Sequence, residues 1–252
     1  MRMVAVVLGG GTGQRLGAAL PKQLLSLNGR SLLEHCVAGF CSAPGIDEVL
    51  VVMAAGYVDQ VKAMLAGYAK VSAVLPGGAA RSDSTRAALA ALGSVSDCGV
   101  LFHDAARPLV DQRIIADCVS ALSVHGAVGT AIPTSDTIVI VSGGAMTEIP
   151  PRERLWRCQT PQAFHLSVIR RAHELAAADP DYAPTDDCGV VLRYLPSVPV
   201  HIVKGSERNI KVTYSGDLAV ASALLSSAPE ELARESPAPG RAAPGRAGAG
   251  RA

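Results

Sequence analysis

Short, mostly apolar runs that resemble strands recur along the first half of the chain. They cover residues 3–8, 48–53, 71–75, 99–103 and 127–132. Runs of this length and composition are typical of strands that are buried on both faces of a parallel sheet. The chain between them predicts helices, because apolar residues return there every three or four positions. The predicted apolar faces are Leu32, Leu33, Cys36, Val37 and Phe40; Val58, Val61, Met64 and Leu65; and Ile114, Ile115, Cys118 and Leu122. Strands that alternate with helices predict an α/β fold.

The pattern changes after Pro133. Two strand-like segments, 137–141 and 146–149, are separated by Ser-Gly-Gly and predict a β-hairpin that projects from the main sheet as an arm. Later patterns predict helices over 166–178, 186–195 and 217–225, and strands over 200–203 and 209–212. The last residues are rich in Pro, Gly, Arg and Ala and hold almost no large apolar side chain. We therefore expect one domain over residues 1–226, with an arm at about 134–160, and a disordered tail over 227–252.

Composition narrows the classes of function. Hydrophobic residues make up 49% of the 252 residues, which is enough for a sizeable core. The net charge is +1 and only 4% of the residues are aromatic, so the chain lacks the basic surface that nucleic acids or anionic membranes attract. No apolar run reaches membrane-spanning length and no signal-peptide pattern opens the chain, which favours a cytoplasmic protein. The six cysteines form no CxxC pair and lie mostly in apolar segments, as reduced core thiols do.

The first candidate site is a glycine-rich loop that follows the strand ending at Leu8. It contains Gly9, Gly10, Gly11 and Gly13, and the cations Arg15 and Lys22 follow it. Glycines let the backbone approach phosphates and direct N–H groups at them, so the loop predicts a cradle for a triphosphate. A glycine turn with two solvated cations is the simpler alternative. A dinucleotide fold is disfavoured because GxGxxG is incomplete, and a Walker A loop is excluded because GK[ST] does not occur.

Two further loops follow predicted strands. Asp104 lies in His-Asp-Ala-Ala-Arg-Pro, at the carboxyl end of its strand, where a carboxylate can hold Mg²⁺ against phosphate oxygens. Arg107 of this motif can contact the same ligand, or can form a buried ion pair with Asp104 that fixes the loop. We expect His103 to orient the loop. The other loop contains Gly77, Gly78, Arg81 and Ser84; it suits a base or ribose, and a helix cap without a ligand is its alternative. Because ligands gather at the carboxyl ends of parallel strands, all three loops are expected around one crevice.

Taken together with later motifs, these loops resemble a known family. In order, the motifs are the glycine loop with Pro21-Lys22-Gln23, GG-x-x-R-x-x-S ending at Ser84, HDAARP, Asp136-Thr137, LWRCQTPQ and NIKVT. The set resembles the 2-C-methyl-D-erythritol 4-phosphate cytidylyltransferases and their relatives, the ribitol-5-phosphate cytidylyltransferases. The resemblance runs in register from Val4 to about Leu225.

The resemblance implies a Rossmann-like, mostly parallel sheet that binds CTP, and a hairpin arm that pairs two subunits and completes the partner's acceptor site. It implies that Arg15 and Lys22 stabilise the pentacoordinate α-phosphorus and that Asp104 is the carboxylate linked to Mg²⁺. The implied CTP-binding residues are Leu8, Gly9, Gly10, Gly11, Gly13, Gly77, Gly78, Arg81, Ser84, Asp104, Ala105 and Arg107. The implied acceptor-binding residues are Asp136, Thr137, Arg152, Thr160 and Lys211, and Arg152 and Lys211 also set the acceptor's phosphate for attack. No protein nucleophile is needed, because positioning and charge compensation supply the catalysis.

Some positions depart from the methylerythritol pattern. The glycine loop does not begin Ala-Ala-Gly, and Val139 replaces a commoner lysine. Two dipeptides, Asp187-Cys188 and Lys204-Gly205, are more similar to the ribitol relatives. The HDAARP motif and Leu155-Trp156 are more similar to the methylerythritol enzymes. Methylerythritol phosphate is the leading acceptor; ribitol 5-phosphate, another polyol phosphate and a phosphonate are alternatives. A regulatory protein without turnover is disfavoured, because Lys22, Asp104 and Lys211 are all present.

Overall fold

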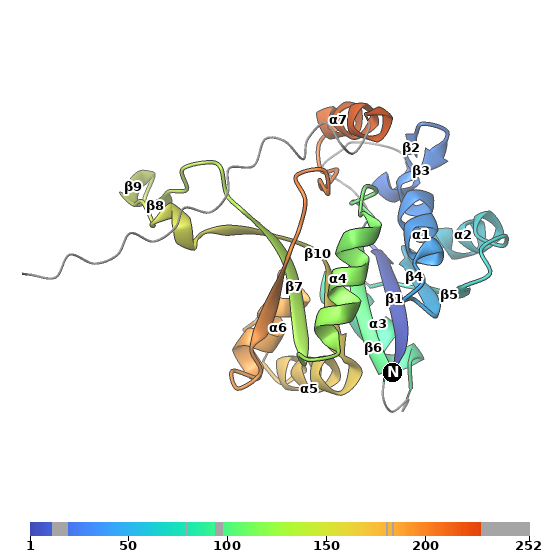
Figure 1. Cartoon of the computed structure of the whole chain (residues 1–252), viewed down its shortest axis with the longest axis horizontal. Helices are drawn as coiled ribbons and strands as arrows, with labels where there is room; N and C mark the ends of the chain where they lie inside the picture. The colour runs from blue at the N-terminus through green and yellow to red at the C-terminus, as the bar shows by residue number, and fades with distance from the viewer. Residues whose placement is uncertain (12–19, 79, 94–97, 180, 183, 228–252) are drawn as a thin grey trace, which may run out of the picture.

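A seven-stranded sheet forms the centre of the protein (Figure 1). The computed structural model describes residues 1–11, 20–78, 80–93, 98–179, 181–182 and 184–227. The strand order is β11-β7-β10-β6-β1-β4-β5. Strand β10 runs antiparallel to both of its neighbours, and every other adjacent pair is parallel. The strands are β1 (Arg2–Gly9), β4 (Glu48–Met53), β5 (Val71–Pro76), β6 (Cys98–Asp104), β7 (Ala127–Pro133), β10 (Trp156–His165) and β11 (Val200–Lys204).

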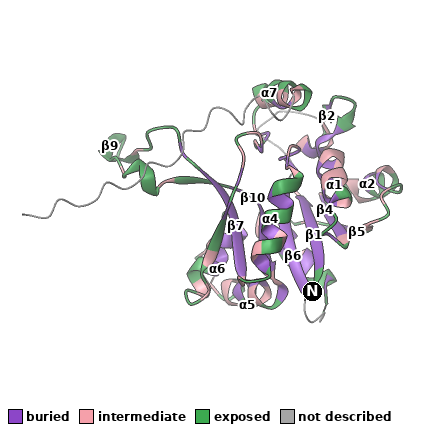
Figure 2. Ribbon diagram, in the orientation of Figure 1, coloured by how far each residue is buried: buried purple, intermediate pink, exposed green. Residues whose placement is uncertain are grey.

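Helices cover both faces of this sheet, and the predicted α/β fold is confirmed. One face packs against α1 (Leu32–Ser42), α2 (Val58–Met64) and α4 (Gln112–Leu122). The other packs against α3 (Arg81–Ala91), α5 (Leu166–Ala177) and α6 (Asp187–Tyr194). The apolar faces predicted for α1 and α4 are fully buried, whereas α2 buries only Val61 within its bounds. Figure 2 shows the resulting buried layer along the central strands.

Two segments differ from the sequence-based expectation. Strand β10 was not predicted, because Gln159, Thr160 and Gln162 interrupt its apolar pattern although all three are buried in the sheet. Residues 209–212 were expected to form a strand and do not. They cross the carboxyl ends of the strands instead, where the Val212 N–H donates to the Ala106 carbonyl at 2.8 Å. Both segments are held by hydrogen bonds that hydrophobic periodicity does not encode.

The arm leaves the sheet where β7 and β10 end their pairing (Figure 1). It contains β8 (Ile140–Ser142), β9 (Ala145–Glu148) and the 3-10 helix η4 (Arg152–Arg154). Gly143 and Gly144 turn the hairpin with positive φ angles of 59° and 80°, which glycine adopts without strain. The arm covers 134–155 rather than about 134–160, because Trp156 already pairs with Pro133 in the central sheet.

The last helix, α7 (Ser215–Ser226), lies over a small hairpin formed by β2 (Ser26–Leu27) and β3 (Arg30–Ser31). A satellite core of Leu27, Leu32, Val212 and Ala221 joins them. Two more 3-10 helices cover Lys22–Leu24 (η2) and Ala55–Tyr57 (η3). None of the helices in the described ranges is long and apolar enough to cross a lipid bilayer. The tail expected over 227–252 lies outside the described residues except for Ser227.

Arg208 fixes the end of α7, and this contact gives a prediction about truncation. Its guanidinium donates to the Ser227 hydroxyl at 3.0 Å and to the Ser227 carbonyl at 3.2 Å. Removing residues 228–252 is expected to leave Tm and activity unchanged, because that composition offers no apolar face to bury. Truncation after Leu225 also removes Ser226 and Ser227, and should lower stability by about 1 kcal/mol, or roughly 2–4 °C in Tm. Differential scanning calorimetry of both truncations checks this; equal Tm values would contradict it.

Candidate functional site

Two of the three predicted loops touch at the carboxyl edge of the sheet. A Cβ atom added to Gly10 would overlap the Ser84 hydroxyl oxygen. A Cβ atom on Gly77 would lie 2.7 Å from the same oxygen and 3.1 Å from the Gly10 Cα atom. The Gly77 N–H donates to the Met53 carbonyl at 2.7 Å, which places this loop across the end of β4. These glycines are therefore required for the two loops to meet, whatever ligand they bind.

The third loop joins the same edge through β1 and β6. Leu8 pairs with Asp104 in the sheet register, and the Ala105 N–H donates to the Leu8 carbonyl at 3.0 Å. On the glycine-rich loop, the Gly11 carbonyl accepts a hydrogen bond from Gln23 Nε2 at 2.9 Å. Gly13 and Arg15 lie outside the described residues, so their predicted roles stay predictions. The predicted convergence of the loops that follow β1, β5 and β6 is confirmed.

Asp104 is surrounded by cations. Its Oδ2 atom lies 2.7 Å from Lys211 Nζ, and its Oδ1 atom lies 3.3 Å from Arg81 Nε. Arg107 Nε is more distant, at 3.9 Å from Oδ2. Burial favours protonation of this carboxyl, but the opposing charges of Arg81 and Lys211 hold the pKa of Asp104 well below its usual range. Asp104 is therefore ionised at any physiological pH, as a ligand for a cation must be.

His103 orients the loop, as predicted, and takes no part in the cationic cluster. Burial lowers the pKa of His103 to about 4, so the imidazole is neutral. The Arg107 carbonyl lies 3.0 Å from Nε2 and can only accept, which assigns the proton of the neutral imidazole to Nε2. Nδ1 then accepts from the Thr160 hydroxyl, 3.0 Å away, and that hydroxyl accepts from the Asp104 N–H at 3.1 Å. This chain ties β6, β10 and the loop after β6 into one unit.

The neutral state of His103 gives a prediction about stability. The imidazole binds protons more readily in the unfolded chain, where its pKa is about 6.5, than in the folded protein. Above pH 6.5 the imidazole is neutral in both states, so it does not lower the free energy of unfolding. As the pH falls from 6.5 toward 4, the unfolded chain takes up the proton first, and the free energy of unfolding decreases. Between pH 7 and pH 5 the loss from this group should be about 2 kcal/mol. Urea unfolding of wild type and His103→Gln at both pH values checks this: the variant should show a smaller loss, and equal losses would contradict the assignment.

The segment over 209–213 brings two predicted catalytic lysines to this edge. Lys211 contacts Asp104, as described above, and Lys22 Nζ donates to the Val212 carbonyl at 3.0 Å. The buried Asn209 anchors the segment, because its Nδ2 atom donates to the Thr160 carbonyl at 2.8 Å. Residues far apart in the sequence thus place Arg81 and Lys211 on the Asp104 carboxylate, and Lys22 on the segment that carries Lys211. A site with this excess of positive charge is suited to a polyphosphate.

Two residues that were predicted to bind a ligand form hydrogen bonds to other groups of the protein. Arg107 donates from Nη1 to the Asn209 carbonyl at 2.8 Å and from Nη2 to the Cys158 carbonyl at 3.3 Å. The Thr160 hydroxyl is held by His103 and Asp104. Both side chains therefore shape the site in this structure, and their direct contact with a substrate stays a prediction.

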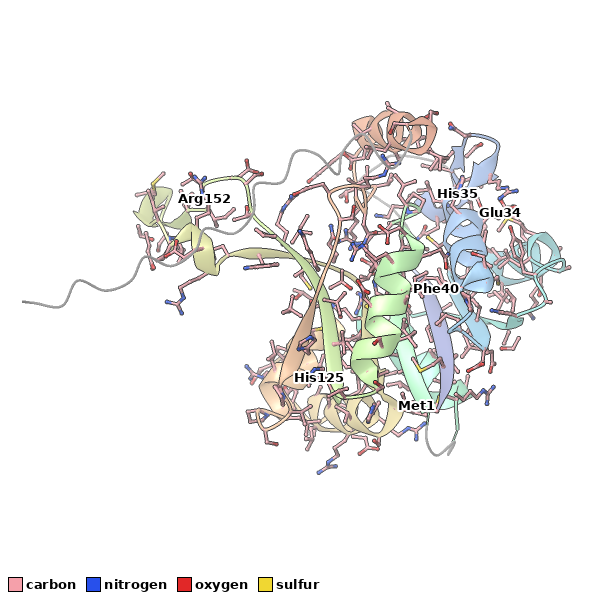
Figure 3. All side chains as sticks on the ribbon, viewed as in Figure 1. Met1, Glu34, His35, Phe40, His125 and Arg152 are labelled. Atoms are coloured by element: carbon pink, nitrogen blue, oxygen red, sulfur yellow. The ribbon has the colours of Figure 1, made fainter. Side chains whose placement is uncertain are left out.

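The predicted acceptor residues on the arm lie apart from this cluster. Arg152 Nη2 donates to the Thr137 hydroxyl at 2.9 Å, and both side chains are exposed, as is Asp136. Figure 3 shows Arg152 on the arm, away from the body of the protein. A single chain therefore does not bring Thr137 and Arg152 to Lys211.

Several residues of the site were missed from the sequence. Asp187 Oδ2 lies 2.7 Å from Arg81 Nη1, and its Oδ1 atom lies 3.0 Å from His173 Nε2. Gln162 Oε1 accepts from the Asp187 and Cys188 N–H groups, each at 3.1 Å. An acidic residue at a helix start is ordinarily a cap, so the pattern gave no sign that Asp187 contacts a residue on another helix.

The donor set fits Mg²⁺ held together with a nucleotide. The described residues contain no group of three or more His, Cys, Asp or Glu side chains that could hold a metal ion. Asp104 is the carboxylate that contacts both Lys211 and Arg81, whereas Asp187, the second carboxylate on Arg81, is only 1% accessible. One carboxylate with phosphate oxygens as the other ligands is a common Mg²⁺ arrangement. Cys36, Cys98, Cys118 and Cys188 are buried, as predicted for core thiols, whereas Cys41 is half-buried and Cys158 is exposed.

Comparison with known proteins places the chain in a family. Residues 3–227 match the family model described as 2-C-methyl-D-erythritol 4-phosphate cytidylyltransferase. A 2-C-methyl-D-erythritol 4-phosphate cytidylyltransferase of Thermobifida fusca (strain YX) is 53% identical over 232 residues, covering 89% of this chain and 93% of the relative. A bifunctional ribulose 5-phosphate reductase/CDP-ribitol pyrophosphorylase of Haemophilus influenzae is 37% identical, covering 89% of this chain and 48% of the relative.

A solved structure has the same fold. The 4-diphosphocytidyl-2C-methyl-D-erythritol synthase of Anaerococcus prevotii DSM 20548 matches with a TM-score of 0.78 and 28% identity, covering 89% of this chain and 98% of that chain. The match agrees with the Rossmann-like, mostly parallel sheet flanked by helices that was expected. The family model and the relatives together show that this chain belongs to the 2-C-methyl-D-erythritol 4-phosphate cytidylyltransferase family.

Proposed function

We propose that the protein transfers the cytidylyl group of CTP to 2-C-methyl-D-erythritol 4-phosphate and releases pyrophosphate. The observation that carries this proposal is the cluster of Arg81, Lys211 and Asp104 beside the glycine loops, together with family membership. A phosphate oxygen of the acceptor attacks the α-phosphorus of CTP and forms a new P–O bond. The bond between the α-phosphorus and the bridging oxygen to the β-phosphate breaks, and pyrophosphate leaves with that electron pair.

The chain's own residues bind and orient the two anions. Lys22 and Lys211 place positive charge where the acceptor and the triphosphate meet, and this charge stabilises the transition state more than the ground state. Arg15 is assigned the same role from the sequence. Asp104 would hold Mg²⁺, which supplies charge neutralisation to the leaving pyrophosphate when it is bound. A cytoplasmic location, expected from the sequence, belongs to the same proposal.

A homodimer completes the acceptor site in this proposal. The arm exposes large apolar side chains, each at least 42% accessible: Ile138, Ile140, Val141, Met146 and Ile149. An isolated exposed hairpin of this kind needs a partner surface to bury it. We assign that surface to a second copy of the chain, with Asp136, Thr137 and Arg152 of each arm reaching the acceptor in the partner's site.

A panel of acceptors tests this function. Purified protein with CTP and Mg²⁺ is assayed for pyrophosphate release with methylerythritol phosphate, ribitol 5-phosphate and other polyol phosphates. We expect the highest kcat/KM with methylerythritol phosphate, and a raised magnesium requirement for Asp104→Asn, because an amide is a poorer Mg²⁺ ligand. A higher kcat/KM with ribitol 5-phosphate would instead favour that acceptor. Absence of turnover with every acceptor would contradict enzymatic function.

A further inference from the structure

Arg81 bridges two carboxylates from different parts of the fold. It begins α3, directly after the glycine loop that contacts Gly10. Its Nη1 atom lies 2.7 Å from Asp187 Oδ2, whereas its Nε atom lies 3.3 Å from Asp104 Oδ1. The shorter and stronger contact is therefore with Asp187, which no role in the proposed reaction explains. Asp104 receives the weaker one.

Asp187 is buried and contacts several elements of the fold. Its side chain is 1% accessible, and the buried His173 on α5 contacts its other oxygen at 3.0 Å. Its backbone N–H is fixed by Gln162 of β10, at 3.1 Å. Contacts from α3, α5 and β10 thus determine where this carboxylate lies. A carboxylate so placed in a dry environment is well suited to orient a guanidinium.

Arg81 also retains an unsatisfied donor. Its Nη2 atom is buried and has no hydrogen-bond partner within the described structure. A buried donor without an acceptor costs about 1–3 kcal/mol, so the guanidinium would gain by turning until two of its nitrogens met both oxygens of Asp104. The ion pair between Asp187 and Nη1 opposes this rotation.

We propose that Asp187, supported by His173, is a positioning residue. It prevents the Arg81 guanidinium from turning to form a bidentate ion pair with Asp104. This inference rests on the proposed function. In this arrangement the Asp104 carboxylate stays available to Lys211 and the substrates, and Nη2 is kept for an acceptor oxygen of the nucleoside triphosphate. The alternative is that Asp187 only stabilises the start of α6, in which case its loss changes Tm and not the site.

Asp187→Asn separates these two roles. The amide keeps the size of the side chain but loses the charge that holds Nη1. We expect the Kd of CTP, measured by calorimetry without Mg²⁺ or acceptor, to rise about tenfold, as loss of a charge-assisted contact does. A crystal structure of the variant should show Arg81 on both oxygens of Asp104. An unchanged Kd with a lowered Tm would overturn the proposal, as would an unmoved Arg81.

Variants of His173 and of an unrelated carboxylate provide the controls. His173→Gln keeps an N–H donor for Asp187 and should bind CTP within about twofold of wild type, whereas His173→Leu should weaken binding several-fold. This pair also tests the inference if Asp187→Asn fails to fold. Asp179→Asn removes a half-buried carboxylate that pairs with Arg193 at 3.1 Å, and it should leave the Kd of CTP unchanged.

A double-mutant cycle tests whether Asp187 acts through Arg81. Arg81→Gln alone should weaken CTP binding by about tenfold or more, and adding Asp187→Asn should change the Kd by less than about twofold. Additive losses would overturn the proposal. If wild type binds no CTP, the proposed function itself fails; if wild type binds CTP and Arg81→Gln weakens it but Asp187→Asn does not, only this inference fails.

Discussion

Lys22→Ala is expected to lower kcat by a factor of about a hundred or more while the protein stays folded. Lys22 Nζ contacts the Val212 carbonyl at 3.0 Å, next to the lysine that pairs with Asp104. In the proposed reaction its charge lies where two phosphate groups must approach each other, and a cation aimed at developing charge typically lowers the barrier by several kcal/mol. Steady-state kinetics with CTP and the acceptor, together with a thermal melt, measure both parts of the prediction.

Two matched variants sharpen the test of Lys22. Lys62→Ala removes an exposed lysine on α2, paired with Asp59 at 3.6 Å, and should leave kcat unchanged. Lys22→Arg keeps the charge but changes its shape, and should recover only part of the activity, because the two side chains are not interchangeable at a positioned site. If Lys22→Ala keeps more than about a tenth of wild-type kcat/KM, Lys22 does not stabilise the transition state.

Hydrophobic periodicity predicted the layers of the fold well. The five apolar runs became β1, β4, β5, β6 and β7, and the apolar faces predicted for α1 and α4 are the faces that pack on the sheet. These elements are buried by apolar contact, which is the information that the pattern carries. Strand β10 escaped prediction because Gln159, Thr160 and Gln162 are buried through hydrogen bonds to other elements. Such bonds leave no periodic signal in the sequence.

Some residues of the candidate site could likewise be predicted from the sequence and others could not. Gly10 and Gly77 follow strands and Asp104 is the last residue of one, so their convergence could be predicted from the rule for carboxyl ends of parallel strands. Asp187 and His173 reach the site through a contact between side chains on three helices, and no local motif marks that contact. The resemblance to a family placed Lys211 in the site, although its segment does not form the strand that its apolar residues suggested.

The positions of Arg152 and Lys211 predict that activity is recovered when two inactive variants, one at each position, are mixed. Lys211 lies in the cationic cluster at the sheet edge, 2.7 Å from Asp104, while Arg152 lies on the projecting arm (Figure 3). In the proposed dimer, each site takes Lys211 from its own chain and Arg152 from its partner. Arg152→Ala should mainly raise the KM of the acceptor. Lys211→Ala should in addition disturb CTP, because it removes a partner of Asp104.

Mixing the two variants should therefore restore activity. A dimer of one Arg152→Ala chain and one Lys211→Ala chain contains one site with both cations and one site with neither. With random exchange, half of the dimers are mixed and half of their sites are whole, so recovery should approach about a quarter of wild type. The variants are mixed in equal amounts, exchanged by mild denaturation and refolding, and assayed for pyrophosphate release at an acceptor concentration where each alone is nearly inactive. Wild type taken through the same treatment sets the scale. If the exchanged mixture is no more active than the separate variants, each chain uses its own Arg152 or none, and the shared site is wrong.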